Sequence, residues 1–375
     1  MRPGGDRQRL LAADAGDARH RLLDVRGRWA VVDQLGLALA IGRAGIQFWD
    51  ISDPSAPVAV ADVEIPEAGY PDSYARVPLS VFWQVPYAYV GGADLGVHIV
   101  DAADPRRPRY LSTYRFDPVL RVGQVQVIGN LLIATAAEGA RTVLLDISDP
   151  EHPEPIAGGD FLAVDSEGVP REAYFTNFAS GFVYYARKSS GGGLMIHDVR
   201  DPTRPVHVGA IETDGSGGYV FPHEGYAFVG QGSFAAIYDA RDPSSITEVT
   251  RLALVGDLDT ATPIGNVVVL SVDDRANPDQ GSAIAPWRTE PDARGPVVGW
   301  TWPVDGATDL RTTSRLGVAF DEMVDARSAF EGSVRLYRAG DPDAGRVPAI
   351  VSAQEAIVNV HPRCPSRRAR TTCSR

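Results

Sequence analysis

Short apolar runs alternate with turn residues along most of the chain, and they come in groups of four. In the clearest group the runs cover residues 79–85, 87–91, 96–100 and 109–116. Runs of this length, rich in Val, Ile, Tyr and Phe and bounded by Gly, Pro and Asp, predict β-strands. Amphipathic helical stretches are almost absent. The pattern therefore predicts an all-β chain built from units of four strands.

The third run of each unit ends at a recurring phrase, Asp-x-x-Asp-Pro. Its five copies start at Asp50, Asp101, Asp146, Asp198 and Asp239. An apolar residue stands two positions before the first Asp in every copy, and in nearly every copy another stands four positions before it. Side chains two apart on a strand share one face, so we expect these residues to pack against a neighbouring unit.

The Asp-x-x-Asp-Pro phrase predicts a turn between the third and fourth strands. An Asp side chain at a strand end can accept backbone N–H groups in an Asx turn, and proline presets φ for the first turn position. The alternative is a ring of five Asp side chains that binds cations, which requires the carboxylates to converge on one point. The turn explains the residues without a ligand and is the favoured interpretation.

The spacing of the copies predicts a β-propeller. Successive copies lie 41 to 52 residues apart, which is the length of one four-stranded blade. A sixth unit keeps the runs 266–272 and 281–285 but lacks the Asp and an outer strand. Residues 22–26 could supply that strand and close a six-bladed ring without an exposed strand edge. A seven- or eight-bladed ring, cut short at the amino terminus, is the alternative.

Composition and charge narrow the possible partners. The chain has 375 residues, a formal net charge of −12 and 22% charged residues. No apolar run reaches the roughly 18 residues of a membrane-spanning helix. A negative surface repels phosphate backbones, so nucleic acid is not an expected partner. We expect a monomer without a transmembrane segment. The first cysteine is Cys364, which excludes a disulfide framework from residues 1–363.

Two of the repeats resemble a known family. Residues 96–101 (Gly-Val-His-Ile-Val-Asp) and 142–150 (Thr-Val-Leu-Leu-Asp-Ile-Ser-Asp-Pro) are similar to the LVIVD repeats of bacterial and archaeal proteins. Trailing prolines belong to the same pattern: Pro57, Pro108, Pro153 and Pro205. The resemblance covers residues 29–292. It implies a β-propeller-like fold and a protein exported to the cell surface, although the fifth copy lacks the second proline and the sixth lacks the Asp.

The pattern changes after residue 292. Residues 296–307, which contain Pro-Val-Asp-Gly-Ala, and residues 316–325, which contain Val-Ala-Phe-Asp, resemble the bacterial Ig-like domain of surface-layer proteins. The resemblance implies a C-terminal Ig-like β-sandwich, with later strands expected at 333–337 and 356–359. The closing strands of such a sandwich are missing from the sequence, so we expect an incomplete domain.

These patterns predict four segments. Residues 1–20 form a disordered amino-terminal segment without the apolar stretch of a signal peptide. Residues 21–292 form the propeller, and residues 293–363 form the partial Ig-like domain. Residues 364–375 form an aberrant or disordered tail, whose abrupt change in composition indicates a frame slip or a truncation.

No catalytic motif is present, so the candidate binding residues come from loops. The sequence contains no Gly-x-Ser-x-Gly elbow, His-Glu-x-x-His helix or phosphate-binding glycine loop. Long connections on a rigid ring commonly carry binding specificity. We therefore predict partner binding through Tyr70, Tyr74, Arg171 and Lys188, which lie in connections of this kind.

The loop 273–281 is the most credible cation site. It brings together the oxygen-bearing side chains of Asp273, Asn277 and Asp279, and a hard ion such as Ca²⁺ prefers oxygen ligands. The loop lacks the residue order of a calcium-binding loop, so an ordinary turn is the favoured alternative. His223 and Glu224 lie between two strand-like runs, where we expect a solvent-exposed turn.

The sequence thus predicts an exported or cell-surface interaction module. Its propeller loops would bind a protein or glycan partner at the cell envelope, and the Ig-like domain would act as a spacer. One alternative is a metal-dependent hydrolase that uses the central channel, which requires carboxylates and imidazoles from several blades to converge. The other alternative is a passive structural scaffold. No catalytic residue and no certain cofactor are assigned.

Overall fold

The computed structural model describes ten stretches of the chain. They are residues 24–26, 29–33, 45–53, 55–69, 75–189, 191–272, 281–311, 313–330, 332–338 and 341–363. These stretches consist of β-strands, turns and one short 3-10 helix, η3 (Pro243–Ser245). None of their helices is long and apolar enough to cross a membrane. The prediction of an all-β chain is confirmed.

In the described part of the chain, five antiparallel sheets of four strands follow one another in chain order. The first contains β1 (Asp24–Arg26), β2 (Trp29–Asp33), β3 (Gly45–Asp50) and β4 (Val58–Glu64). The second contains β5 (Ser80–Gln84), β6 (Tyr87–Gly91), β7 (Val97–Asp101) and β8 (Arg109–Tyr114). The third contains β9 (Val122–Ile128), β10 (Leu131–Ala136), β11 (Arg141–Asp146) and β12 (Glu154–Leu162).

The fourth and fifth sheets repeat this order, and a sixth sheet follows. The fourth contains β13 (Ala173–Ala179), β14 (Phe182–Arg187), β15 (Gly192–Asp198) and β16 (Val206–Thr213). The fifth contains β17 (Val220–His223), β18 (Tyr226–Gly230), β19 (Ala235–Asp239) and β20 (Thr247–Leu252). Within the described residues the sixth has three strands: β21 (Leu258–Ile264), β22 (Val267–Val272) and β23 (Ser282–Pro286).

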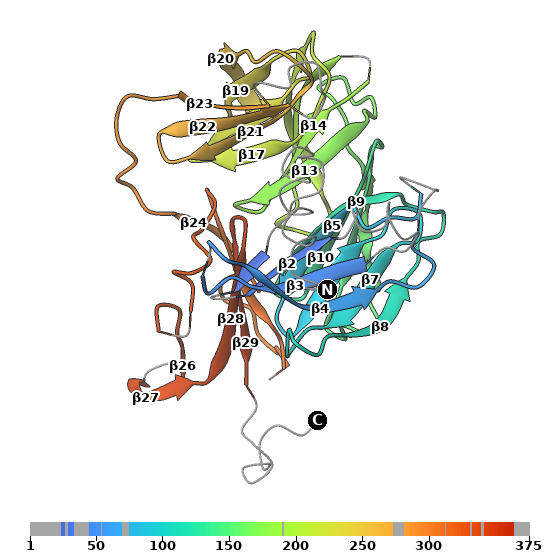
Figure 1. The fold of residues 1–375 in the computed structure, drawn as a ribbon, viewed down its shortest axis with the longest axis vertical. Coiled ribbons are helices and arrows are strands. Elements are labelled where there is room, and N and C mark those ends of the chain that lie inside the picture. Colours follow the sequence, from blue (N-terminus) through green and yellow to red (C-terminus); the bar gives the residue numbers. More distant parts are fainter. Residues whose placement is uncertain are drawn as a thin grey trace, which may run out of the picture.

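The sheets are arranged as the blades of a propeller. The first strand of each sheet from the second onward lies next to the first strand of the following sheet, in the order β5, β9, β13, β17 and β21. Together these strands form an inner wall (Figure 1). The second blade buries both faces of its sheet. On β7, Val97 and Ile99 belong to a cluster with Val125 of the third blade, whereas Val100 belongs to a cluster with Phe48 of the first. Radial packing of up-and-down four-stranded sheets is the β-propeller arrangement that the repeats predict.

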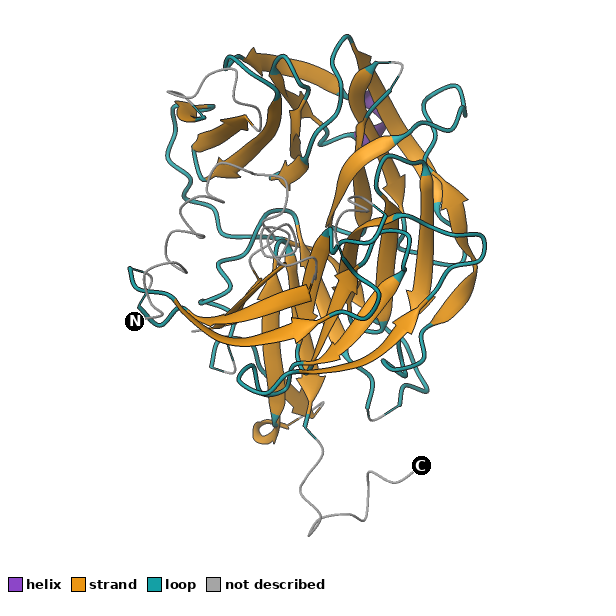
Figure 2. Cartoon of the chain, turned by 45° about the vertical axis from the view of Figure 1, so that its right-hand side comes forward, coloured by secondary structure: helices purple, strands orange, loops and turns teal. Residues whose placement is uncertain are grey.

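The up-and-down order gives the propeller two faces. Turns between the first and second strands, and between the third and fourth, lie on one side, which we name the turn face. Connections between the second and third strands, and between blades, lie on the other side, which we name the loop face. Isolated bridges such as Gly139 to Ala173 join adjacent blades at the loop face. Figure 2 shows connections of both kinds in teal at the strand ends.

One predicted strand pairing is wrong. The sequence predicts that residues 22–26 supply the outer strand of the sixth sheet, but β1 pairs with β2 as the inner strand of the first sheet. Val25 lies opposite Ala30 in this pairing. The partner strand β2 begins only a few residues after β1, so the local hairpin has a lower loop-closure cost than a pairing with the distant sixth sheet.

A separate four-stranded sheet follows the propeller. Its strand order is β24 (Val298–Trp302), β25 (Leu316–Phe320), β29 (Ile357–Pro362) and β28 (Ala349–Gln354). A hairpin of β26 (Leu336–Arg338) and β27 (Asp341–Val347) is attached to it. Trp300, Ala319 and Ile357 share one hydrophobic cluster with Ile128 and Phe178 of the third and fourth blades. The C-terminal sheet therefore packs directly on the propeller (Figure 1).

Candidate functional site

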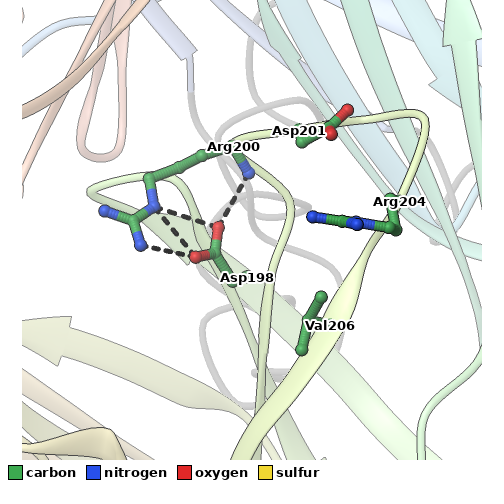
Figure 3. A pocket seen from close by; sticks show the side chains of 5 residues that line it. All are labelled: Asp198, Arg200, Asp201, Arg204 and Val206. Carbon is green, nitrogen blue, oxygen red and sulfur yellow. Dashed lines mark hydrogen bonds and ion pairs between the residues drawn. The ribbon is translucent and has the colours of Figure 1, made fainter.

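The Asp-x-x-Asp-Pro corners lie on the turn face, and their carboxylates are occupied by their own turns. In the fourth blade Asp198 accepts the N–H of Arg200 at 2.9 Å, and Asp201 accepts the N–H of Thr203 at 3.1 Å. The other four copies have the same two bonds. The Arg200 guanidinium also binds Asp198, beside a hollow of about 420 Å³ (Figure 3). These bonds match the turn interpretation, because each carboxylate stays at its own corner.

A hairpin of the C-terminal sheet enters the centre of the propeller. β28 lies against β1 and β5, and β29 lies against β9, which are all inner strands. We name β28, β29 and their turn (residues 349–362) the axial hairpin. Gln354 accepts a hydrogen bond from the Trp83 N–H at 3.0 Å and donates one to the Val81 carbonyl at 2.9 Å. The inner strand of a blade is a sheet edge, so these bonds satisfy backbone groups that burial would leave unpaired.

Asn359 pairs with backbone groups of β9 and of the turn that follows it in the same way. Its amide donates to the Val127 carbonyl at 2.8 Å, and its Oδ1 accepts the Gly129 N–H at 2.7 Å. Gly129 has a φ of 56°, and a Cβ added there would lie 2.1 Å from Cδ1 of Trp302. Both the backbone conformation and the close approach of the C-terminal sheet require glycine at this turn. Side-chain amides thus anchor the axial hairpin to two blades.

The turn of the axial hairpin carries a carboxylate into the channel. The oxygens of Glu355 lie 3.5 Å from the amide nitrogen of Gln124 and 3.3 Å from that of Gln126. Gln124 stands near the loop-face end of β9, so the turn reaches most of the way through the propeller. Glu355 is half-buried, and the surrounding protein removes much of the water from around its carboxylate. This desolvation raises the pKa of Glu355 to about 7.

Two of the predicted binding residues lie on the loop face. Arg171 donates to Asp165 at 2.6 Å, and Lys188 donates to Glu138 at 2.7 Å. The backbone N–H of Lys188 donates to the carbonyl of Glu172, the residue next to Arg171. The structure therefore brings Arg171 and Lys188 to neighbouring positions on one face, each with an acidic partner.

Aromatic rings gather beside these charges at the loop-face end of the inner wall. Phe175 and Tyr219 stack with ring centres 4.4 Å apart, and Tyr174 packs edge-on against Phe175 at 4.7 Å. The Lys188 ammonium lies 4.2 Å from the centre of the Tyr174 ring. Tyr174 and Phe175 are buried, whereas Tyr219 is partly exposed. Rigid aromatic groups beside charged side chains are typical of binding surfaces.

The other predicted site residues lie outside the described residues. They are Tyr70, Tyr74, Asp273, Asn277 and Asp279. The predictions of partner binding and of a Ca²⁺ site at these positions stay predictions.

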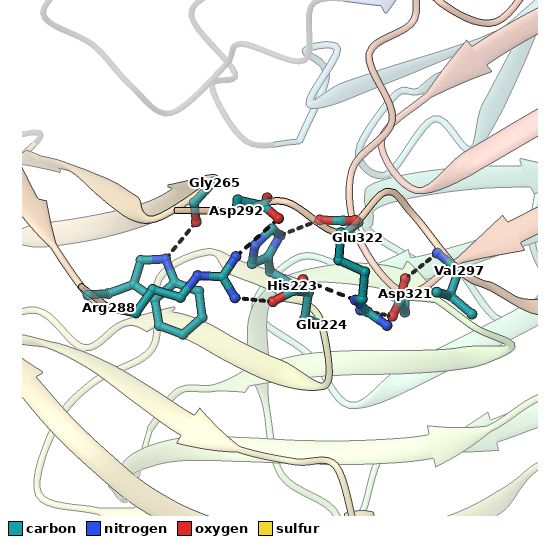
Figure 4. A network of polar contacts seen from close by, with 10 residues as sticks. His223, Glu224, Gly265, Arg288, Asp292, Val297, Asp321 and Glu322 are labelled. Atoms are coloured by element: carbon teal, nitrogen blue, oxygen red, sulfur yellow. Dashed lines mark hydrogen bonds and ion pairs between the residues drawn. The ribbon is translucent and has the colours of Figure 1, made fainter. Parts of the chain in front are cut away.

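A buried polar cluster joins the propeller to the C-terminal sheet (Figure 4). His223 ends β17, Asp292 lies in the segment after β23, and Glu322 follows β25. His223 Nδ1 lies 3.2 Å from Glu322 Oε2. Each of the three residues offers one ligand atom, and these atoms lie within 4.8 Å of one another, so they could hold a metal ion. The predicted solvent-exposed turn at His223 is wrong: this side chain is buried, and the C-terminal sheet meets its turn.

Two arginines border this cluster. Arg288 binds Glu224 through one guanidinium nitrogen, and its Nη2 lies 3.2 Å from Oδ1 of Asp292. Arg294 binds Glu224 at 3.1 Å and also binds Asp321. Four carboxylates, those of Glu224, Asp292, Asp321 and Glu322, therefore stand against two guanidinium groups.

Burial shifts the pKa values of His223 and Glu322 in opposite directions. Desolvation, with repulsion from the neighbouring carboxylates, raises the pKa of Glu322 to about 7. Desolvation also lowers the pKa of His223, although nearby carboxylates oppose it. Both shifts favour neutral side chains. The environment thus disfavours a negative charge on Glu322 and a positive charge on His223.

Sequence reasoning missed Asp292, Glu322 and Glu355. Glu322 stands in the Phe-Asp-Glu stretch that predicts a strand end, and no metal-ligand spacing links it to His223 or Asp292. Glu355 lies in a stretch without any recognised motif. Glu322 and Glu355 reach their propeller neighbours only because the C-terminal sheet docks on the propeller.

Comparisons with known proteins identify no family. No family model matches the chain, and no curated protein matches it either. Among solved structures it is similar to BamB from Moraxella catarrhalis, with 14% identity over 70% of this chain and 70% of that chain and a TM-score of 0.44. A putative 6-phosphogluconolactonase from Bacteroides fragilis has 14% identity over 62% and 69%, with a TM-score of 0.45. A periplasmic gluconolactonase from Pseudomonas aeruginosa has 10% identity over 61% and 68%, with a TM-score of 0.48. Similarity at this level carries no functional argument.

Proposed function

We propose that this chain is an exported or cell-surface interaction module whose loop face binds a protein or glycan partner. The observation that carries the proposal is the position of the axial hairpin. Gln354 and Glu355 contact inner strands, so the hairpin closes the channel from the turn face. The loop face then remains as the side on which blade connections are available. Loops on a rigid scaffold commonly carry binding function.

The proposed binding surface centres on the fourth blade. Lys188 and Arg171 lie there near the Tyr174 and Phe175 rings, and Tyr219 joins them from the start of the fifth blade. Ion pairs with solvent access contribute little stability, typically about 0–1 kcal/mol, so Lys188 can exchange Glu138 for a group of the ligand at small cost. Arg171 is held by the buried carboxylate of Asp165. The partly exposed ring of Tyr219, stacked on the buried Phe175, supplies a rigid aromatic contact for a partner.

The proposed location rests on resemblance. The repeats of residues 29–292 resemble LVIVD repeats, and residues 296–325 resemble surface-layer Ig-like domains. The net charge of −12 favours a neutral glycan or a protein with a basic patch over an anionic polymer. In this proposal the C-terminal sheet closes the turn face, in addition to any role as a spacer.

An enzyme that works in the channel receives less support. It requires ionisable groups from several blades at one mouth. Around the hairpin turn the described side chains are the amides of Gln124 and Gln126 and the hydroxyl of Thr176, with Glu355 as the carboxylate. Amide groups that hydrogen-bond to a single carboxylate fit a hairpin that closes the channel better than a catalytic site. A passive scaffold differs from the proposed module only in having no partner.

A pull-down with matched charge reversals tests the proposal. The full chain is incubated with envelope extract and with an immobilised glycan panel, beside the loop-face variant Lys188→Glu and the turn-face control Arg107→Glu. We expect Lys188→Glu to reduce recovery of the partner at least tenfold and Arg107→Glu to leave it unchanged. Recovery of nothing above background by the unmodified chain, or equal loss in both variants, would refute loop-face binding.

A further inference from the structure

We propose that His223, Asp292 and Glu322 bind one divalent transition-metal ion, with Zn²⁺ as the best match, and that this ion fastens the C-terminal sheet to the propeller. The three ligands come from the fifth blade, from the segment after the sixth sheet and from the end of β25 (Figure 4). Coordination by all three would therefore connect parts of the chain that are far apart in sequence. The site is independent of the proposed partner-binding surface.

The ligand atoms are close enough to share one ion. All three lie within 4.8 Å of one another, and His223 Nδ1 is 3.2 Å from Glu322 Oε2. Two ligands of a tetrahedral zinc, at bond lengths of about 2.0–2.2 Å, lie about 3.3–3.6 Å apart. One imidazole with two carboxylates is a ligand set that zinc accepts, and water would supply the fourth position.

Two buried atoms in the cluster point to a missing ligand. Among the described residues, Nε2 of His223 and Oε1 of Glu322 have no hydrogen-bond partner. Both residues are only 4% exposed. Buried polar groups are normally hydrogen-bonded, and buried charges are normally paired or coordinate metals. An ion bound to the Glu322 carboxylate would supply that interaction for Oε1. An imidazole binds an ion through one ring nitrogen, so Nε2 of His223 would gain it only as the ligand atom in place of Nδ1.

The charge of the cluster also favours a dication. With four ionised carboxylates and the two guanidinium groups of Arg288 and Arg294, the cluster has a net charge of about −2. One divalent ion would cancel this excess. The alternative is a proton on Glu322 that is shared with a neutral His223, and this alternative predicts no metal dependence.

An imidazole ligand from His223 favours zinc over harder ions. Ca²⁺ and Mg²⁺ prefer six or more oxygen ligands, whereas imidazole suits zinc and the later first-row metals. The cluster offers three protein ligand atoms, one from each residue and one of them an imidazole nitrogen, which is fewer than the six oxygens that Ca²⁺ or Mg²⁺ prefers. A small ion with four ligands therefore fits this site best.

Metal titration of the full chain tests the site. The protein is stripped with a chelator, dialysed, and titrated with ZnCl₂ under calorimetry, and its zinc content is measured by elemental analysis. We expect one ion per chain and a higher unfolding temperature on loading, because a ligand that binds only the folded state stabilises it. We expect His223→Ala to weaken zinc binding at least 100-fold. His152→Ala, which removes an exposed histidine from a turn-face corner, should change it less than twofold.

Two further measurements keep the inference falsifiable if His223→Ala fails to fold. Co²⁺ replaces zinc in the unmodified chain, and its visible spectrum should show a four-coordinate centre with nitrogen and oxygen ligands. Glu322→Gln should abolish the rise in unfolding temperature on addition of zinc. Substoichiometric binding by the stripped unmodified chain, or equal affinity in His223→Ala and His152→Ala, would overturn the inference. A stripped Glu322→Gln protein as stable as the zinc-treated unmodified chain would identify the shared proton instead.

Discussion

At the scale of single residues, the side-chain amides of the axial hairpin do what a neighbouring strand would do. Gln354 and Asn359 each place a donor and an acceptor opposite the backbone of an inner strand. An amide side chain has the same donor and acceptor as a peptide group, so it can satisfy a sheet edge without another strand. An apolar residue would pack at these positions but would leave buried N–H and C=O groups unpaired. The amides therefore determine where the hairpin sits.

Glu355→Gln should remove part of the pH dependence of stability. The folded state raises the pKa of Glu355 from 4.5 to about 7, so between these values the folded state holds a proton that the unfolded state releases. The contribution of Glu355 to the free energy of unfolding is then largest below about pH 4.5. It falls as the pH rises to about 7 and stays low at higher pH. We expect the variant to be more stable than the unmodified chain at pH 8 by about 2 kcal/mol, since one pKa unit is about 1.4 kcal/mol and residual solvent contact reduces the effect.

Urea denaturation of both proteins at several pH values measures this difference. The free energies of unfolding should converge near pH 4, where the glutamate is protonated in both states. Glu322 has a similar shift, so the variant keeps some dependence on pH. A constant difference between pH 4 and pH 8 would show that the Glu355 carboxylate is not desolvated in the channel.

At the scale of elements, the sequence predicts what local chemistry determines. Predicted strands at 79–85 and 87–91 match β5 and β6 closely, because alternation and turn residues act over a few positions. The Asx bonds at Asp198 and Asp201 follow from the same local rules. The predictions fail for β1, whose partner depends on competition between near and distant strands. They also miss the His223 cluster, whose residues come from three separate segments.

Gly317→Ala should loosen the C-terminal sheet. A Cβ at position 317 of β25 would lie 2.2 Å from Cγ1 of Ile128 and 2.7 Å from the backbone nitrogen of Gly129. The second atom belongs to the backbone and cannot rotate away, so the sheet must shift from the third blade. Overpacking of this kind costs about 1–3 kcal/mol. Gly295→Ala is the matched control, because no atom lies within 4 Å of its added Cβ.

Limited proteolysis and chemical denaturation measure both glycine variants. We expect Gly317→Ala to unfold at lower denaturant concentration and to be cleaved faster within residues 296–363, with Gly295→Ala unchanged in both assays. Equal behaviour of the two variants would mean that the close contact between β25 and the β9–β10 turn does not hold the sheet in place.

At the scale of the whole molecule, the propeller and the C-terminal sheet share one core. Trp300, Ala319 and Ile357 of the sheet belong to the cluster that includes Ile128 and Phe178 of the blades. Hydrogen bonds from Gln354 and Asn359 join the same two parts. Domains that are joined by a flexible linker unfold separately, whereas parts with a common core unfold together. The molecule therefore combines a repeat architecture with an axial element that several blades hold at once.

We expect thermal unfolding of the full chain to show one transition for both parts. Far-ultraviolet circular dichroism reports mainly the blades, which hold most of the strands, and tryptophan fluorescence includes Trp300 and Trp302 of the sheet. Loss of the sheet would expose Ile128 and Phe178 and leave the Val127 carbonyl and Gly129 N–H without Asn359, so the blades should not survive it unchanged. The two signals should give midpoints that agree within about 2 °C, and Gly317→Ala should lower both together. A fluorescence transition well below the dichroism transition would instead identify residues 296–363 as an independent domain that only rests on the propeller.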